Sequence, residues 1–342
     1  MARGTGAESG AVWARGAFTI VELLVVIGII GVLAGVLLAS FTGGTEAARA
    51  AKCLSNMRNL AQGAISYAAR HGDYPNAGSC AAIDMDVNGV KYYEHVGWIS
   101  WLSKNDEYHS RRSRGGSVGS FQKCPNVSAY CTDDKDADFA ITNGVLWKRV
   151  GQNRDTYICP SHAIQARKHA KTARFSYAMS AHFGYDWTRG SDAAESYGRG
   201  GVSMSESNRR FDRTLLFAEL PFAIPGANDS ANEVSEDTAY STGNDTELVD
   251  CVLQYNANVN GKAYHGPGRE WSGTAEAIHF NHRSGKRYCA HVVFADGHVE
   301  KLLLPKKKSG GLNSVQLTGV LCGGVDVTFD GSTYRVATGA DK

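Results

Sequence analysis

One segment of the sequence gathers side chains that could bind a metal. It reads "HFNHRSGKRYCAH", and imidazole and thiol groups are ligands that zinc prefers. The candidate ligands are His279, His282, Cys289 and His291, with Asp296 and His298 close behind. Their spacings match no common structural zinc pattern. The sequence therefore favours a disulfide at Cys289, provided that this part of the chain lies in an oxidising compartment.

A cysteine beside a histidine could instead serve as a nucleophile with its base. Cys159 lies just before His162, and Cys289 has several histidines near it. Neither cysteine lies in a known catalytic signature, and Pro160 after Cys159 is typical of a turn. The sequence also contains no nucleophile elbow, no Walker A motif and no dinucleotide-binding fingerprint. We therefore expect that the protein is not an enzyme.

The segment "DMDVNG" (84–89) offers a third chemistry, because it matches the opening of an EF-hand calcium loop. The ligand positions would be those of Asp84, Asp86 and Asn88. The twelfth position holds His95 instead of glutamate, and no flanking pair of helices is evident. The sequence favours a polar turn here, and calcium is the only cofactor that it suggests.

Charge gives little support for a nucleic-acid partner, because the net charge of the 342 residues is only +2. The stretch 92–116 does mix aromatic residues with arginines, as single-strand binders do. These arginines are Arg111, Arg112 and Arg114. The favoured alternative is a packed helix with Trp98, Trp101 and Leu102, followed by a solvated loop. We do not expect nucleic acid as a partner.

The chain contains eight cysteines, and all of them follow residue 50. They are Cys53, Cys80, Cys124, Cys131, Cys159, Cys251, Cys289 and Cys322. An even number suits disulfides if this part of the chain lies outside the cytoplasm, but eight cysteines allow about 105 pairings. The short spacing from Cys124 to Cys131 makes a local loop the simplest pairing. Buried free thiols are the alternative.

An apolar run extends from Phe18 to Phe41 and contains a single charged residue, Glu22. As a helix the run would be about 36 Å long, which is enough to cross the hydrocarbon of a membrane. The preceding segment 1–17 carries a weak excess of positive charge, which favours a cytoplasmic N-terminus. The sequence therefore predicts a single-pass inner-membrane protein with an extracytoplasmic head.

With its leader, the segment "GAFTIVELLVVIGIIGVLAG" resembles the class III signal of type IV prepilins and type II secretion pseudopilins. That pattern has a short basic leader, a small residue before the cut, Phe first in the mature chain and Glu fifth. A cut after Ala17 makes Phe18 first and Glu22 fifth; a cut after Gly16 is the alternative. The resemblance implies that a prepilin peptidase cleaves here and methylates the amine of Phe18. It also implies that Glu22 pairs with the N-terminal amine of a neighbouring subunit.

Later segments resemble the large-head prepilin-like proteins that carry a C-terminal H-x9-DG signature. These segments are "KCLSNMRNLAQGAISYAARHGDYP", "TYICPSH", "SYAMSAHFGYD", "RTLLFAEL" and "HRSGKRYCAHVVFADGHVEKL". The signature residues would be His282, Asp296 and Gly297. Thirteen residues separate His282 from Asp296, where the family pattern has nine.

The elements that must position these residues follow from periodicity. Gly43 and Gly44 should weaken the first helix, and Thr45 can cap a new amphipathic one that Gly72 ends. Alternating patterns predict strands at 213–219 and 291–303, with a type I′ turn at Asp296-Gly297. We expect an α+β fold in which a long N-terminal transmembrane and amphipathic helix, the pilin spine, packs on an antiparallel sheet.

The expected domains follow this order. They are a cytoplasmic leader (1–17), a transmembrane half-helix (18–41), an amphipathic half-helix (42–72), a globular α+β head (73–304), and a linker with a C-terminal β-hairpin (305–342).

The resemblance implies a structural subunit of a type II secretion pseudopilus or a type IV pilus-like filament, either periplasmic or on the cell surface. Its partners would be prepilin peptidase, copies of itself or other pilin-like subunits, and an assembly platform in the inner membrane. Small residues in the apolar run would let neighbouring helices approach closely; these are Gly28, Gly31 and Gly35. The alternative is a membrane-anchored extracytoplasmic module that binds DNA or a surface and does not polymerise.

Overall fold

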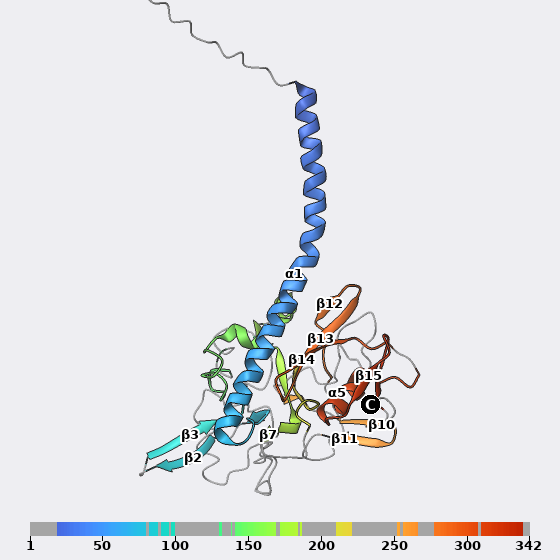
Figure 1. Ribbon diagram of the computed structural model, residues 1–342. Helices are drawn as coiled ribbons and strands as arrows, with labels where there is room; N and C mark the ends of the chain where they lie inside the picture. Colours follow the sequence, from blue (N-terminus) through green and yellow to red (C-terminus); the bar gives the residue numbers. More distant parts are fainter. Residues whose placement is uncertain are drawn as a thin grey trace, which may run out of the picture. The chain divides into compact units, whose positions relative to one another are not determined.

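The fold is α+β, and a computed structural model describes most of its helices and strands (Figure 1). The described residues are 19–79, 82–87, 90–95, 97–99, 130–131, 138, 141–168, 172–183, 185–186, 210–220, 252–253, 256–265, 277–306 and 309–337. The chain divides into two compact units, Met1–Thr45 and Glu46–Lys342. The amphipathic half-helix and the C-terminal segment therefore belong to the same unit as the head.

Helix α1 (Ile20–His71) is the longest element, and it is continuous through the two glycines at 43 and 44. The predicted new start at Thr45 is wrong. Each glycine costs a helix only about 1 kcal/mol, which the turns on either side offset. The predicted end is confirmed: Gly72 has φ +86° and its N–H donates to the carbonyl of Ala68 over 2.8 Å.

Among the described residues, no helix has the length and apolar character needed to cross a membrane. This finding corrects both the predicted transmembrane half-helix at 18–41 and the predicted single-pass membrane location.

The second part of α1 buries an apolar stripe in the core of the head. Its fully buried members are Cys53, Met57, Leu60, Ala61, Ala64 and Ala68. They recur at intervals of three and four residues, which places them on one side of the helix. Met57 and Tyr67 pack in the same core.

The main sheet has six strands: β6 (Tyr177–Ser180), β8 (Leu215–Glu219), β9 (Val252–Leu253), β12 (His282–Ser284), β13 (Arg287–Phe294) and β14 (Val299–Leu303). The order is β12-β13-β8-β6-β9, and β14 also pairs with β13. Each pair is antiparallel except β6 with β9, which is parallel. The predicted strands at 213–219 and 291–303 are therefore confirmed as β8 and as the hairpin β13–β14.

The turn of that hairpin differs from the predicted type. Gly297 has φ +90°, and its N–H donates to the carbonyl of Phe294 over 2.9 Å. Asp296 does not have a positive φ, whereas a type I′ turn needs one at both central residues. A Cβ on Gly297 would lie 3.0 Å from the Cδ1 of Ile65, so the turn lies directly against α1.

Shorter elements surround the sheet and the second part of α1. The strand pairs are β1 (Gly78–Ser79) with β7 (Tyr185–Asp186), β2 (Ala82–Val87) with β3 (Val90–His95), β4 (Tyr130–Cys131) with β5 (Thr172–Ala173), and β10 (Asn256–Val259) with β11 (Lys262–His265). The short helices are η2 (Arg154–Tyr157), α4 (Pro160–Lys168) and η3 (Ala181–Phe183).

The C-terminal segment contains a helix that the sequence analysis missed. Helix α5 (Ser314–Cys322) begins with a capping box, in which Asn313 and Gln316 bond each other's backbone N–H. The predicted hairpin follows as β15 (Val327–Phe329) and β16 (Tyr334–Val336). The guanidinium of Arg287 donates to the carbonyls of Leu304 and Gly331, each over 2.8 Å, and joins the hairpin to the sheet.

An aromatic cluster fills the core beside α1. Trp98 is fully buried, with its ring centre 4.9 Å from that of Phe217 and 5.9 Å from that of Tyr157. The expected packing of Trp98 is confirmed, but residues 97–99 form a bridge and a bend instead of a helix. Trp101, Leu102 and the three arginines of the 92–116 stretch lie outside the described residues.

We expect Gly144→Ala to destabilise the head. A Cβ at Gly144 would lie 2.1 Å from the carbonyl oxygen of Trp98, so the backbone itself must shift. Overpacking of this kind costs about 1–3 kcal/mol in the free energy of unfolding, which denaturant titration measures. The matched control is Gly44→Ala, where a Cβ meets nothing within 4 Å. Equal stability of the two variants would contradict the close packing at Gly144.

Candidate functional site

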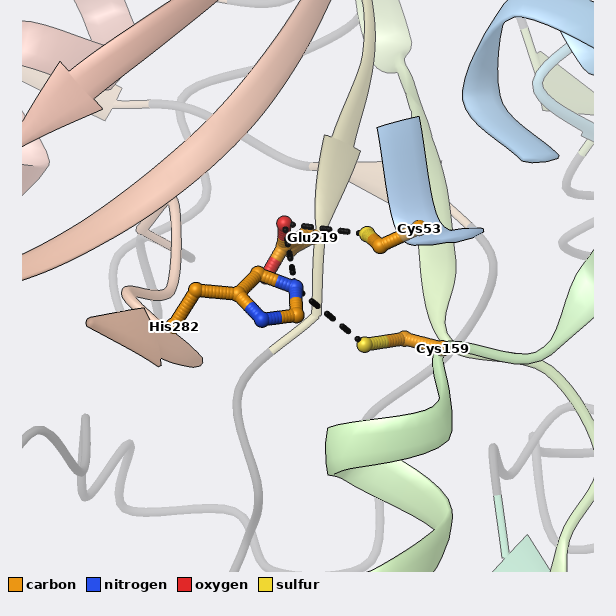
Figure 2. A group of neighbouring side chains, drawn as sticks. All are labelled: Cys53, Cys159, Glu219 and His282. Carbon is orange, nitrogen blue, oxygen red and sulfur yellow. Dashed lines mark hydrogen bonds and ion pairs between the residues drawn. The ribbon is translucent and has the colours of Figure 1, made fainter. Parts of the chain in front are cut away.

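Four polar side chains from four separate elements meet in the interior of the head (Figure 2). Cys53 lies on α1 and Cys159 directly precedes α4, while Glu219 ends β8 and His282 begins β12. All four are fully buried. One sulfur, nitrogen or oxygen atom from each lies within 4.8 Å of those of the others.

Helix α1 positions both cysteines. Cys53 belongs to its buried stripe, and Asn56, one turn further on, is also fully buried. The side-chain amide of Asn56 donates to the carbonyls of Asp155 and Ile158 over 2.7 and 3.0 Å. These bonds hold the segment that leads to Cys159 against α1. Pro160 then begins α4, a position that suits proline because its missing N–H is not needed there.

A gap between two strands positions the carboxylate of Glu219. On one edge of β13, residues from Val292 onwards pair with β8, beginning with Val292 opposite Ala218. On the same edge, β12 pairs with β13 only as far as Cys289. His291 lies between these two stretches, so its backbone N–H has no strand partner on this edge. That N–H donates to Oε1 of Glu219 over 3.1 Å, and its ring Nδ1 lies 3.2 Å from the same oxygen. The carboxylate thus completes the sheet from inside the core.

The ring of His282 faces two sets of partners. Its Nε2 lies 3.5 Å from Sγ of Cys159 and 3.4 Å from Oε1 of Glu219. Its Nδ1 lies 3.0 Å from Oε1 of Glu46, which also accepts the hydroxyl of Ser161 over 3.2 Å. Cys53 completes the group, because its Sγ lies 3.2 Å from Oε1 of Glu219.

Burial and charge act in opposite directions on this group. Burial alone would raise the pKa of Glu219, but the charge and hydrogen bonds of His282 and His291 hold it well below its usual range. Burial would lower the pKa of His282, but Glu219 and Cys159 raise it well above its usual value. Hydrogen bonds from Cys53 and His282 outweigh burial and lower the pKa of Cys159 to about 6, whereas burial raises that of Cys53. The group therefore favours a thiolate at Cys159.

Of the predicted metal ligands around position 285, only His282 joins this group. His291 contacts it through Glu219, and the His282 and His291 rings lie 5.1 Å apart. Cys289 pairs with His282 across the strands but lies outside the group. Asp296 is at the far end of β13, about 20 Å along the strand, and bonds His298 over 2.6 Å. The structure therefore does not bring His282 and Asp296 together.

The predicted cysteine–histidine pairs are also rearranged. Cys159 faces His282, whereas Nδ1 of His162 lies 2.6 Å from the hydroxyl of Ser176. Sequence reasoning missed Cys53 and Glu219 as members of the site. One signal was present for Glu219: it is a single charge between apolar residues in "LLFAEL".

The described cysteines have the thiol form that the sequence left as an alternative to disulfides. Cys53, Cys159, Cys289 and Cys322 are all free and buried. The side chains of Cys80, Cys124, Cys131 and Cys251 lie outside the described residues. The predicted pairing of Cys124 with Cys131 therefore stays a prediction.

The calcium motif takes a different form from an EF-hand loop. Asp84 and Asp86 lie in strand β2, opposite Tyr93 and Lys91 of β3. An extended strand pair does not curl around an ion as the twelve-residue loop does. Asn88 lies outside the described residues.

Two predicted assembly features lie in the first unit. Gly28, Gly31 and Gly35 are helical, and a Cβ on any of them would meet nothing within 4 Å. Ala17 and Phe18, at the predicted cut, lie outside the described residues.

Comparison with known proteins finds no matching family model, no similar curated protein and no similar solved structure.

We expect acid to destabilise the head through His162. Burial lowers the pKa of His162 to about 3, so below pH ~6.5 the unfolded chain takes up a proton that the folded chain cannot hold. Stability should fall as the pH falls from ~6.5 towards 3, by about 1.4 kcal/mol per pH unit for this one group. His162→Gln should remove that part of the slope in denaturant titrations at pH 5 and 6.5. A slope unchanged in His162→Gln, and equal to that of the exposed-residue control His71→Gln, would contradict this assignment.

Proposed function

We propose that the protein is a pilin-like structural subunit that is cut after Ala17 and assembles into a secretion pseudopilus or a pilus-like filament. The observation that carries this proposal is the division of α1. From Cys53 onwards, an apolar stripe of the helix is buried in the head of the same chain. Over 20–36, its large apolar side chains are exposed, from 47% at Val26 to 78% at Ile20. A continuous apolar surface of this kind requires a partner.

The partner that fits best is the same segment of other copies. The glycines at 28, 31 and 35 have open space where a side chain would stand, so a second helix can approach closely there. The residues that resemble a prepilin signal directly precede this surface. Processing would therefore create a free N-terminus at the beginning of the segment that assembles.

Glu22 has a local role in the uncut chain that is separate from assembly. Its carboxylate accepts the backbone N–H and the hydroxyl of Thr19, each over 2.9 Å, and its own N–H donates to that hydroxyl. This is a capping box at the start of α1, and its hydrogen bonds lower the pKa of Glu22. The carboxylate is thus ionised at neutral pH and lies four residues after the new amine at Phe18.

The first test is the processing step. The full chain is expressed with and without a prepilin peptidase, and intact-mass and peptide spectrometry identify its N-terminus. We expect a chain that begins at N-methylated Phe18 only when the peptidase is present. An N-terminus that stays uncut in both cells would contradict the proposal, and a cut after Gly16 would move the processing site by one residue.

The second test separates the capping role of Glu22 from a charge role in assembly. Glutamine can still complete the capping box but carries no charge. Alanine neither completes the box nor carries a charge. We expect normal cleavage and at least ~10-fold fewer filaments for both Glu22→Gln and Glu22→Ala, because each lacks the charge that pairs with a neighbour's amine.

Filaments are counted by electron microscopy of sheared cell fractions. The control is Asp73→Asn, which removes an exposed carboxylate just beyond α1 and should assemble normally. If Glu22→Gln assembles as well as the unchanged chain, Glu22 acts only as a cap, and the proposed ion pair between subunits is wrong.

A further inference from the structure

We infer that Cys53, Cys159, Glu219 and His282 bind one zinc ion, which fastens α1 to the sheet of the head (Figure 2). Two thiolates, an imidazole and a carboxylate are the ligand types of zinc sites in proteins. Thiolate sulfur is a poor ligand for calcium and magnesium, which select oxygen. This site is independent of filament assembly, and neither proposal requires the other.

Three of the separations between the four side chains lie close to those of a tetrahedral site. With Zn–S near 2.3 Å and Zn–N or Zn–O near 2.0–2.1 Å, neighbouring ligand atoms lie about 3.3–3.8 Å apart. The observed separations are 3.2 Å from Cys53 to Glu219, 3.5 Å from Cys159 to His282, and 3.4 Å from His282 to Glu219. All four ligand atoms lie within 4.8 Å of one another, so small side-chain shifts would let one ion contact all of them.

The second layer of contacts orients the ligands as in known zinc sites. A zinc-bound histidine usually donates its other ring N–H to a carboxylate, which fixes the ring. Here Nδ1 of His282 lies 3.0 Å from Oε1 of Glu46, so Nε2 is left to face the cluster. Arg49 lies 3.3 Å from the same carboxylate and balances its charge. His291 similarly holds Oε1 of Glu219 through its backbone and its ring.

One buried acceptor in the cluster lacks a donor. Oε2 of Glu219 has no hydrogen-bond partner among the described residues, although its side chain is fully buried. Buried carboxylate oxygens are nearly always paired, because leaving one unpaired costs free energy. An ion bound by the Glu219 carboxylate would compensate the negative charge that Oε2 shares with Oε1, as well as the charge of the two sulfurs.

The four ligands come from four of the segments that resemble prepilin-like proteins. Cys53 lies in "KCLSNM", Cys159 in "TYICPSH", Glu219 in "RTLLFAEL" and His282 in "HRSGKRYCAH". These segments are spread over most of the chain, yet each contributes one ligand to the same point.

Four-fold coordination by buried side chains leaves no open position for a substrate, so the ion would be structural. It would join the second part of α1, at Cys53, to α4, β8 and β12. Binding requires both cysteines as thiolates and Nε2 of His282 without a proton, so it would release whichever of these protons remain. It would stabilise only the folded head, because the unfolded chain holds the four ligands far apart.

The test uses the full chain, purified from zinc-supplemented cells without chelators or metal-affinity steps. Elemental analysis should find about one zinc per chain, and intact mass should show Cys53 and Cys159 as thiols. Cobalt exchanged into the unchanged chain should give a thiolate charge-transfer band and the visible bands of a tetrahedral site. This measurement needs no variant, so it remains decisive if a variant fails to fold.

Variants then assign the ligands. Cys159→Ser should reduce bound zinc at least ~10-fold and remove part of the cobalt charge-transfer band. The matched control is Cys322→Ser, which changes another fully buried free thiol in α5, outside the cluster. It should keep about one zinc per chain.

Each other outcome would overturn the inference. No stoichiometric metal, or a mass that shows a disulfide between Cys53 and Cys159, would exclude the site. About one zinc per chain in a folded Cys159→Ser variant would place the metal elsewhere. Iron or copper in place of zinc would overturn the choice of ion.

Discussion

The arrangement of the head depends on one buried carboxylate. Glu219 ends β8 where the sheet is incomplete, and it is fully buried beside His282 and His291. Removing a charge from water costs several kcal/mol unless partners compensate it. The partners here come from α1 and two strands, so satisfying this one group brings those elements together. The tight packing of α1 against the sheet is the consequence.

Helix α1 has two roles along its length. Its second part belongs to the core of the head, and Asn56 and Cys53 contribute polar contacts there as well as apolar burial. Its first part, over 20–36, exposes large apolar side chains. A metal-bound anchor at Cys53 would keep the second part fixed while the first part packs with other copies. The proposed filament role and the proposed zinc site therefore concern different parts of one helix.

The local features of the fold were predictable from the sequence, because each depends on neighbouring residues. The buried stripe on α1, the stop at Gly72 and the hairpin at Asp296-Gly297 all follow from periodicity and turn chemistry. Helix α5 was not predicted. Its apolar residues also fit a strand pattern, and the capping box at Asn313 and Gln316 decides in favour of the helix.

The cluster itself was only partly predictable. His282 was identified, because it lies among other histidines, and Cys159 was considered with the wrong histidine. Cys53 and Glu219 were missed, because each lies inside a segment typical of an ordinary core helix or strand. Ligand spacing reveals a metal site only when the ligands are close in sequence. Here the fold brings together residues that are separated by more than half of the chain.

The zinc K-edge X-ray absorption spectrum of the purified full chain tests the account of the head most directly. The geometry of the cluster predicts two sulfur neighbours at about 2.3 Å and two nitrogen or oxygen neighbours at about 2.0–2.1 Å. This shell is the one that two thiolates, one imidazole and one carboxylate would give, as Cys53, Cys159, His282 and Glu219 supply. A shell of nitrogen and oxygen alone, without sulfur, would contradict the account.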